Sequence, residues 1–76
     1  MSDDPAFLDA TGLLCPLPVL KARKRLMGLA RGEALTVIAD DPAAVIDIPH
    51  FCAEAGHTLV SGQTDGPVQT YVIRKG

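Results

Sequence analysis

The segment CPLP, Cys15–Pro18, places a thiol and two prolines at the start of an apolar pattern with helical spacing. The first N–H groups of a helix have no partner within the helix, so a proline there loses no helical hydrogen bond and its fixed φ stiffens the turn. With Pro16 and Pro18 as the first and third helical residues, Cys15 is the N-cap residue. Its sulfur then lies beside the positive end of the helix dipole, which stabilises an anion. The sequence therefore predicts an exposed, reactive Cys15 with a pKa below the value of about 8.5 of a free thiol.

The second cysteine, Cys52, stands on the apolar stripe of a second predicted helix. Free cysteine is among the residue types most often buried, so we expect Cys52 to be a packing residue. The same interpretation is open for Cys15, but its proline context favours a functional thiol. A thiol oxidoreductase would need the two cysteines within disulfide reach, with Cα atoms about 4.4–6.8 Å apart, and is a less favoured alternative.

The residue types and their spacing give little support for a metal site or for a histidine base that activates a cysteine. The cysteines are separated by 36 residues and form no C-x2-4-C pair, so no metal site is predicted. His50 and His57 have no spacing that fixes a Cys–His pair, and each is expected at the surface or at a helix end rather than as a base. No glycine-rich phosphate loop occurs, and no cofactor is predicted.

Charge is unevenly distributed along this chain of net charge −2. The stretch from Thr11 to Gly32 contains no acid and five bases, which are Lys21, Arg23, Lys24, Arg25 and Arg31. Three of them, Lys21, Lys24 and Arg25, are expected on the outward side of the first helix, with Arg23 near them. Such a face is either a docking surface for acidic proteins or nucleic acid, or simply a solvated face. With one tyrosine and two phenylalanines, base stacking has few candidates.

The length of 76 residues predicts a single domain, residues 1–76, that is too small for elaborate internal cavities. Any site should therefore lie at the surface. No run approaches the roughly 18 apolar residues of a membrane span. Residues 1–8 have neither the basic start nor the apolar core of a signal peptide. Two cysteines are too few for a disulfide scaffold, so we expect a cytoplasmic protein with reduced thiols and no membrane contact.

Apolar periodicity predicts four strands and two helices in the order βαβαββ. The expected strands span residues 6–9, 33–39, 57–63 and 68–74, and the first helix runs from 16 to about 32. Two β-α-β crossovers favour parallel pairing, and the last two strands form an antiparallel hairpin around a turn at 64–67. The predicted fold class is an α/β (α+β) two-layer sandwich with both helices on one face of a four-stranded mixed sheet.

The second helix carries clear start and stop signals. Asp41 is predicted as its N-cap, Pro42 as its first residue and Gly56 as its end. Pro49 lies inside the pattern and predicts a kink or a break. In the first helix, Leu20 and Met27 extend the apolar stripe.

Three segments carry a resemblance to a known family: LDATGLLCPLPVLKARK, GEALTVIADDPAAVIDIPHFC, and GHTLV with TDGPVQTYVIRKG. Together they resemble the TusA/SirA-like sulfur-carrier family from about Phe7 to Gly76, with the CPxP core intact. The resemblance implies the same βαβαββ sandwich. Within the family, the chain most resembles the carrier that serves 2-thiouridine synthesis in tRNA.

The resemblance also implies a chemistry for Cys15. This cysteine would accept a sulfane sulfur from a cysteine desulfurase, hold it as a persulfide and pass it to a downstream sulfur-relay protein, with tRNA as an indirect client. Gly12, Pro16 and Pro18 match the family motif and would shape the loop and the start of the helix. A nearby resolving thiol would release the sulfur and leave a disulfide, so a buried Cys52 suits a carrier.

The resemblance implies a partner-dependent carrier with sulfurtransferase-type chemistry rather than a stand-alone enzyme. We expect a monomer that docks partners in part through its first helix, although the motif does not specify these residues individually; they are Lys21, Arg23, Lys24 and Arg25. Other members of the family supply sulfur for molybdenum cofactor or take part in sulfur oxidation or regulation. An RNA-binding or regulatory module is a further alternative, because the layout is similar to the C-terminal domain of a bacterial translation initiation factor. Salt-dependent tRNA binding that survives Cys15→Ser would favour it.

Overall fold

The computed structural model describes residues 6–76 and confirms the predicted order βαβαββ. Residues 1–5 lie outside the described residues. They belong to the predicted domain and to the segment 1–8, which lacks the sequence features of a signal peptide. The elements are β1 (Ala6–Ala10), α1 (Leu17–Met27), β2 (Ala34–Ala39), α2 (Ala44–Ala55), β3 (Thr58–Asp65) and β4 (Val68–Arg74). Within this part of the chain, no helix is long and apolar enough to cross a membrane.

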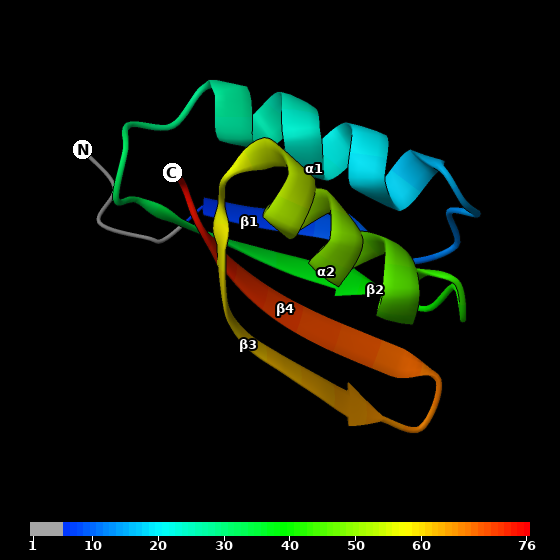
Figure 1. The fold of residues 1–76 in the computed structure, drawn as a ribbon. Helices are drawn as coiled ribbons and strands as arrows, with labels where there is room; N and C mark the ends of the chain where they lie inside the picture. The colour runs from blue at the N-terminus through cyan, green and yellow to red at the C-terminus, as the bar shows by residue number, and fades with distance from the viewer. Residues whose placement is uncertain (1–5) are drawn as a thin grey trace.

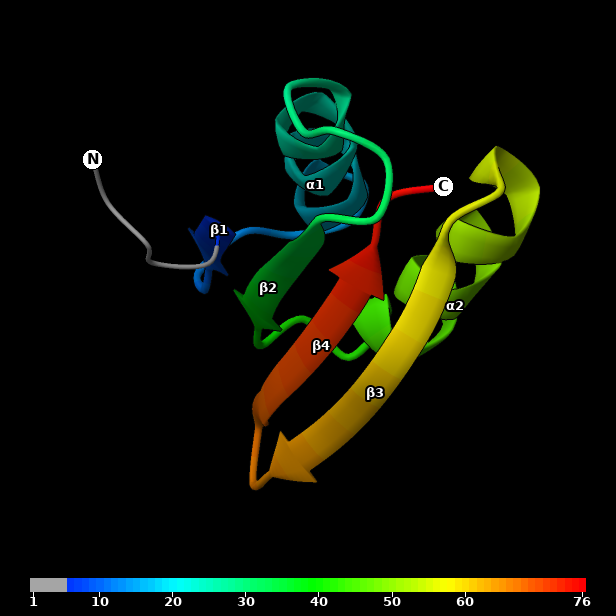
Figure 2. The ribbon, with the colours of Figure 1, turned by 90° about the vertical axis from the view of Figure 1, so that its left-hand side faces the viewer.

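The four strands form one mixed sheet in the order β1-β2-β4-β3. β1 pairs with β2 in parallel, while β4 pairs with β2 and with β3 in antiparallel fashion. Both helices lie on the same face of the sheet, as the two perpendicular views show (Figures 1 and 2). The predicted two-layer sandwich is therefore confirmed.

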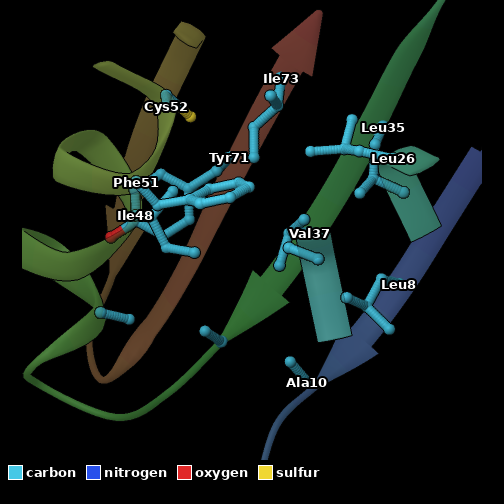
Figure 3. Packing of buried hydrophobic residues seen from close by; sticks show 13 residues of the cluster. Leu8, Ala10, Leu26, Leu35, Val37, Ile48, Phe51, Cys52, Tyr71 and Ile73 are labelled. Carbon is cyan, nitrogen blue, oxygen red and sulfur yellow. The ribbon is translucent and has the colours of Figure 1, made fainter. Parts of the chain in front are cut away.

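The core lies between the helices and the sheet, because alternate strand residues point to the same face. In β2, Leu35 and Val37 are fully buried and pair with Ile73 and Tyr71 of β4. Figure 3 shows the helical side chains that meet them, which are Leu26 from α1 and Ile48, Phe51 and Cys52 from α2. This packing fixes both helices against the sheet.

The first helix is shorter than predicted. It ends at Met27 with Gly28 as its C-cap, rather than near Gly32. The ammonium of Lys75 donates to the carbonyl oxygens of Leu26 at 2.7 Å and Leu29 at 3.1 Å, so a residue from the end of the chain satisfies the last carbonyls. Leu29 still packs against the core, which explains why the apolar pattern continues beyond the helix.

The extension of the apolar stripe to Leu20 and Met27 is also wrong. Their side chains are 48% and 74% exposed, respectively, whereas Ala22 and Leu26 are fully buried. The buried face of α1 is therefore narrower than the apolar stripe predicted from the sequence. The sheet and the neighbouring helix cover only part of the circumference of α1.

The second helix begins at Ala44 with Ala43 as N-cap, so the predicted start at Asp41 and Pro42 is wrong by two residues. Asp41 and Pro42 instead form a preceding turn, in which Ala44 N–H donates to the Asp41 carbonyl at 2.9 Å. The Asp41 carboxylate nevertheless accepts the N–H of Ala43 at 3.3 Å. The capping chemistry predicted for this aspartate is thus present just outside the helix.

Pro49 does not break α2, which runs without interruption from Ala44 to Ala55. A proline in a helix deprives the carbonyl four residues earlier of its donor. Here that residue is Val45, in the first turn and 49% exposed, where water can reach the backbone. Gly56 ends the helix as predicted, with a left-handed φ of 79°.

Candidate functional site

Cys15 lies in the loop between β1 and α1, at the end of the sheet where the parallel strands β1 and β2 both finish (Figure 1). The loop that follows β2 is therefore its neighbour. Two hydrogen bonds join the loops: Gly12 N–H donates to Asp40 Oδ1 at 2.9 Å, and Cys15 N–H donates to Asp41 Oδ2 at 2.6 Å. Two adjacent aspartates thus hold the backbone of the loop that carries the thiol.

Gly12 and the two prolines flank the thiol, but both prolines lie one position earlier relative to the helix than predicted, Pro16 as the N-cap and Pro18 as the second helical residue. Gly12 has a φ of 78°, in the left-handed region where a side chain would be strained. Pro16 is the N-cap of α1, and its carbonyl accepts the first helical hydrogen bond, from Leu20 N–H at 3.1 Å. Pro18 lies in the first turn and is buried. Cys15 therefore precedes the N-cap by one residue, and its prediction as the N-cap is wrong.

The sulfur of Cys15 is exposed and donates a hydrogen bond to a carboxylate of α2. The Sγ–Oδ2 distance to Asp47 is 2.9 Å. This hydrogen bond raises the pKa of the Cys15 thiol. Partial desolvation by neighbouring groups and the negative charges of Asp47 and Asp41 raise the pKa further, by smaller amounts. The predicted lowering of the pKa is therefore wrong.

The error has a physical cause. The predicted pKa rested only on the dipole of the helix that follows Cys15, and that helix begins one residue later than predicted. The acids beside the sulfur come from a different part of the chain. A charged acceptor in direct contact outweighs the partial charge of a helix terminus, because the dipole effect falls off within the first turn.

A surface groove of about 370 Å³ opens beside the thiol, between the two helices. Its lining combines apolar side chains with acids, and consists of Cys15, Pro16, Val19, Asp47, His50, Phe51 and Glu54. A second hollow continues the groove along the helices and shares Val19, Phe51 and Glu54 with it. Arg23 lines this second hollow but not the groove beside the thiol.

Sequence reasoning missed Asp47 and Glu54 as site residues. A signal for Asp47 was available, because β1 and β2 were predicted to be parallel. The loop after one parallel strand and the start of the helix after the next lie at the same edge of the sheet. The first-turn acid of α2 is therefore placed to meet the loop that carries Cys15.

The two histidines occupy different environments. His50 is exposed on α2, as predicted, and also lines the groove beside Cys15. His57 lies beyond the other end of α2, where its ring packs 5.6 Å from that of Phe51 and its Nδ1 accepts the N–H of Gly76 at 3.0 Å. Burial, with a smaller contribution from the charge of Lys75, lowers the pKa of His57.

Cys52 is 2% exposed and packs in the core, as predicted. Burial raises the pKa of its thiol. Both cysteines are free, so neither forms a disulfide in this structure. Between residues 6 and 76, no three His, Cys, Asp or Glu side chains are arranged to hold a metal ion.

The basic residues of α1 line two different surface hollows. All four candidates are exposed. Lys21, Lys24 and Arg25 gather around Leu8 on the side of α1 that faces β1. Arg23 lies on the other side, in the hollow that it shares with Glu54. Only Arg23 is therefore close to the groove that leads to the thiol.

Large apolar side chains are exposed around the end of the molecule that carries Cys15. Leu14 is 70% and Leu17 44% exposed on the chain beside the thiol, and at the start of α2 Val45 is 49% and Ile46 73% exposed. Exposed apolar side chains that gather in one region are typical of protein contact surfaces.

The fold and the site together describe a small α/β protein that presents one exposed thiol and buries the other. Residues 6–75 match the family described as sulfurtransferase TusA, and the chain therefore belongs to this family. Its fold is similar to the crystal structure of a SirA-like protein from Desulfitobacterium hafniense, with a TM-score of 0.81 and 27% sequence identity over 93% of this chain and 97% of that one. Membership of the family indicates a role in sulfur transfer, and so implies partners that give and take the sulfur.

Proposed function

We propose that this protein is a sulfur carrier that holds a sulfane sulfur as a persulfide on Cys15. The observation that carries the proposal is the contrast between its two thiols. Cys15 lies exposed beside a groove on a loop held by hydrogen bonds, whereas Cys52 is buried in the core. A persulfide survives only where no second thiol can attack it and leave a disulfide.

The carrier chemistry needs no cofactor of its own. In loading, the Cys15 thiolate attacks the outer sulfur of a persulfide on the donor protein, a new S–S bond forms, and the donor cysteine leaves as a thiolate that takes up a proton. In delivery, an acceptor cysteine attacks the outer sulfur on Cys15 in the same way. Each step exchanges one S–S bond for another, so there is no net oxidation or reduction.

We propose a cysteine desulfurase as the donor and a downstream sulfurtransferase as the acceptor, with 2-thiolation of the wobble uridine in tRNA as the final use. Family membership supports the relay. The exposed apolar side chains around Cys15 provide a contact surface that successive partners could share. Delivery to molybdenum cofactor or to sulfur oxidation would use the same thiol, so the final use is tested separately. Deletion of the gene should remove 2-thiouridine from hydrolysed tRNA, whereas loss of molybdoenzyme activity with intact 2-thiouridine would contradict this client.

The direct test of loading is intact mass after incubation with a cysteine desulfurase and cysteine. Wild type and Cys52→Ala should gain about 32 Da, reversibly on addition of a reductant, as expected of a persulfide. Cys15→Ala should gain nothing. A gain that persists in Cys15→Ala would contradict the proposal.

No observation favours the RNA-binding alternative over the carrier. The acids beside the thiol, Asp41, Asp47 and Glu54, would repel phosphate at this end of the molecule. The basic side chains of α1 line two different hollows, and only Arg23 of the four lines the one that adjoins the groove.

A further inference from the structure

We propose that Asp47 is a positioning residue that makes this protein a better sulfur donor than acceptor, by stabilising the discharged Cys15 thiol relative to the loaded persulfide anion. The inference rests on the proposed carrier function and assigns a direction to it. It starts from one contact, the hydrogen bond of 2.9 Å from Cys15 Sγ to Asp47 Oδ2.

Both ends of this contact are held in place. Asp47 lies in the first turn of α2, next to Ile48, which is fully buried. The backbone of Cys15 is held by its hydrogen bond to Asp41 at 2.6 Å, and Asp41 is held in turn because its carbonyl accepts the side-chain amide of Gln69 at 2.9 Å. The fold therefore positions the carboxylate of Asp47 and the sulfur of Cys15 next to each other.

The contact suits one state of the carrier and opposes the other. A carboxylate only accepts hydrogen bonds, so it can bind a protonated thiol but not a thiolate. In the loaded carrier, Sγ bears the outer sulfur in place of the proton and cannot donate. A persulfide is a stronger acid than the corresponding thiol, so at neutral pH the loaded group is an anion beside a second anion. Loading thus replaces an attraction at Asp47 with a repulsion.

Within residues 6–76, the groove beside Cys15 is lined by acids and one histidine but by no lysine or arginine. From α2, Asp47, His50 and Glu54 line the groove, and Asp41 contacts the backbone of Cys15 from the loop after β2. From α1, the groove is lined only by Val19, with Pro16 at the start of the helix, while Arg23 lies in the second hollow. The raised pKa of the Cys15 thiol agrees with this acidic environment.

The consequence for sulfur transfer follows from the balance of the step. In delivery, the acceptor thiolate bonds to the outer sulfur and the S–S bond to Cys15 breaks. Cys15 leaves as a thiolate, takes up a proton from solvent, and as a thiol donates a hydrogen bond to the Asp47 carboxylate. This hydrogen bond removes the nucleophile that would reverse the step. The same stabilisation of the discharged state makes the loading equilibrium less favourable by an equal factor. Loading therefore depends on a donor persulfide that gives up its outer sulfur more favourably than the persulfide on Cys15 does.

The first experiment measures the loading equilibrium without a partner protein. Wild type and Asp47→Asn are equilibrated with glutathione and glutathione persulfide at a fixed ratio at pH 7, and the loaded-to-discharged ratio is read by intact mass. Contacts between exposed charges change an equilibrium constant by up to about fivefold, so the ratio should rise about two- to fivefold in Asp47→Asn. Glu54→Gln, which removes a groove charge with no contact to the sulfur, should give a smaller rise, and Asp65→Asn, on the hairpin, should give none. An unchanged ratio in Asp47→Asn, or an equal rise in Glu54→Gln, would overturn the proposal.

The second experiment needs no sulfur donor. The rate of alkylation of Cys15 by iodoacetamide is followed against pH, with Cys52→Ala as the common background. Asp47→Asn should move the midpoint of the pH profile to lower pH. Asp47→Ala also removes the carboxylate, should shift the midpoint in the same direction, and replaces Asp47→Asn if that variant folds poorly. A tenfold gain in thiolate fraction raises the alkylation rate only about threefold, because nucleophilicity falls with pKa. An unmoved midpoint in folded variants would overturn the proposal, since a merely structural role for Asp47 would change rates without shifting the profile.

The two experiments separate the proposals. If no variant accepts sulfur while the midpoint shifts in Asp47→Asn, the carrier function fails, and the assignment of direction that depends on it fails with it. If every variant accepts sulfur with the same equilibrium, the carrier function stands and the role of Asp47 is wrong.

Discussion

The thiols of both cysteines in this protein have a raised pKa, but for different reasons. The pKa of Cys15 is raised chiefly by its hydrogen bond to Asp47 at the surface, whereas the pKa of Cys52 is raised by burial in the core. A raised pKa is usually associated with an inert thiol. Here it does not distinguish the functional cysteine from the structural one. Exposure and the identity of the neighbouring groups distinguish them instead.

The comparison extends to what holds each residue in place. The side chain of Cys52 is held by apolar packing in the core. Cys15 is fixed by a polar chain that starts in the core: Tyr71 OH donates to Gln69 Oε1 at 2.6 Å, Gln69 Nε2 donates to the Asp41 carbonyl at 2.9 Å, and Asp41 accepts the Cys15 N–H. Gln69 is only 4% exposed. A buried polar group with all its partners orients the surface thiol from within the fold.

The largest expected contrast is between serine substitutions at the two cysteines. Cys15→Ser should abolish sulfur loading and leave the free energy of unfolding nearly unchanged, because the residue is exposed. Cys52→Ser should load normally but lose about 1–3 kcal/mol of stability, the cost of burying a hydroxyl without a partner. Urea unfolding and intact mass on the same samples check both. Equal loading in the two variants would remove the distinction between the sites.

The next effect concerns the polar chain that holds the loop. Asp41→Ala removes the acceptors of the Cys15 and Ala43 N–H groups, so the free energy of unfolding should fall by about 1–3 kcal/mol and loading should slow. Asp40→Ala, which removes only the acceptor of Gly12 N–H, is the matched control and should have the smaller effect on both. The measurements are urea unfolding and the rate of mass gain. A larger effect of Asp40→Ala would mean that the loop is held mainly through Gly12.

A smaller effect distinguishes the cysteines by pH. Burial raises the pKa of Cys52 above its unfolded value, so the folded protein retains a proton that the unfolded chain loses. This contribution to stability is complete below about pH 8.5 and is lost as pH rises above it. Stability should therefore fall more steeply with rising alkaline pH in wild type than in Cys52→Ala, as measured by thermal unfolding between pH 7 and 10. Parallel curves would show that Cys52 does not titrate differently on folding.

The smallest expected effect concerns the basic residues of α1. Arg23 lines the hollow that continues the thiol groove, whereas Lys24 lies on the side toward β1. If partners approach along the groove, Arg23→Glu should slow loading about two- to fivefold, less so at high salt, and Lys24→Glu should change it little. Initial loading rates by a cysteine desulfurase at two salt concentrations test this. The reverse order of effects would place the docking surface on the β1 side of α1.

The sequence was sufficient for the fold because β2 and β4 alternate in burial and glycines mark the end of α2 and the hairpin turn. Leu35 and Val37 point inward as their period-two spacing requires, and Gly56 ends α2 where predicted. The end of α1 was placed too late, although Gly28, which caps the helix, is a local stop signal. Local propensity carries no signal for the contact of Lys75, which reaches the Leu26 carbonyl from a part of the chain remote in sequence.

The site was predicted only in part for the same reason. The exposure of Cys15 and the burial of Cys52 follow from local patterns, and both are observed. The acidity of the Cys15 thiol depends on Asp47, which is remote in sequence and close only because β1 and β2 run parallel. Strand pairing could have suggested this neighbourhood, but not the direct contact between sulfur and carboxylate.

The central claim, that the sulfur is carried by Cys15 and not by Cys52, is tested most directly by locating it. Trypsin separates the two thiols, because Cys15 lies in the peptide 1–21 and Cys52 in the peptide 32–74. Wild-type protein is loaded by a cysteine desulfurase, the outer sulfur is capped by alkylation in the folded state, and the digest is analysed by mass. The capped persulfide should be found on peptide 1–21 and be absent from peptide 32–74. A capped persulfide on peptide 32–74 would contradict the account.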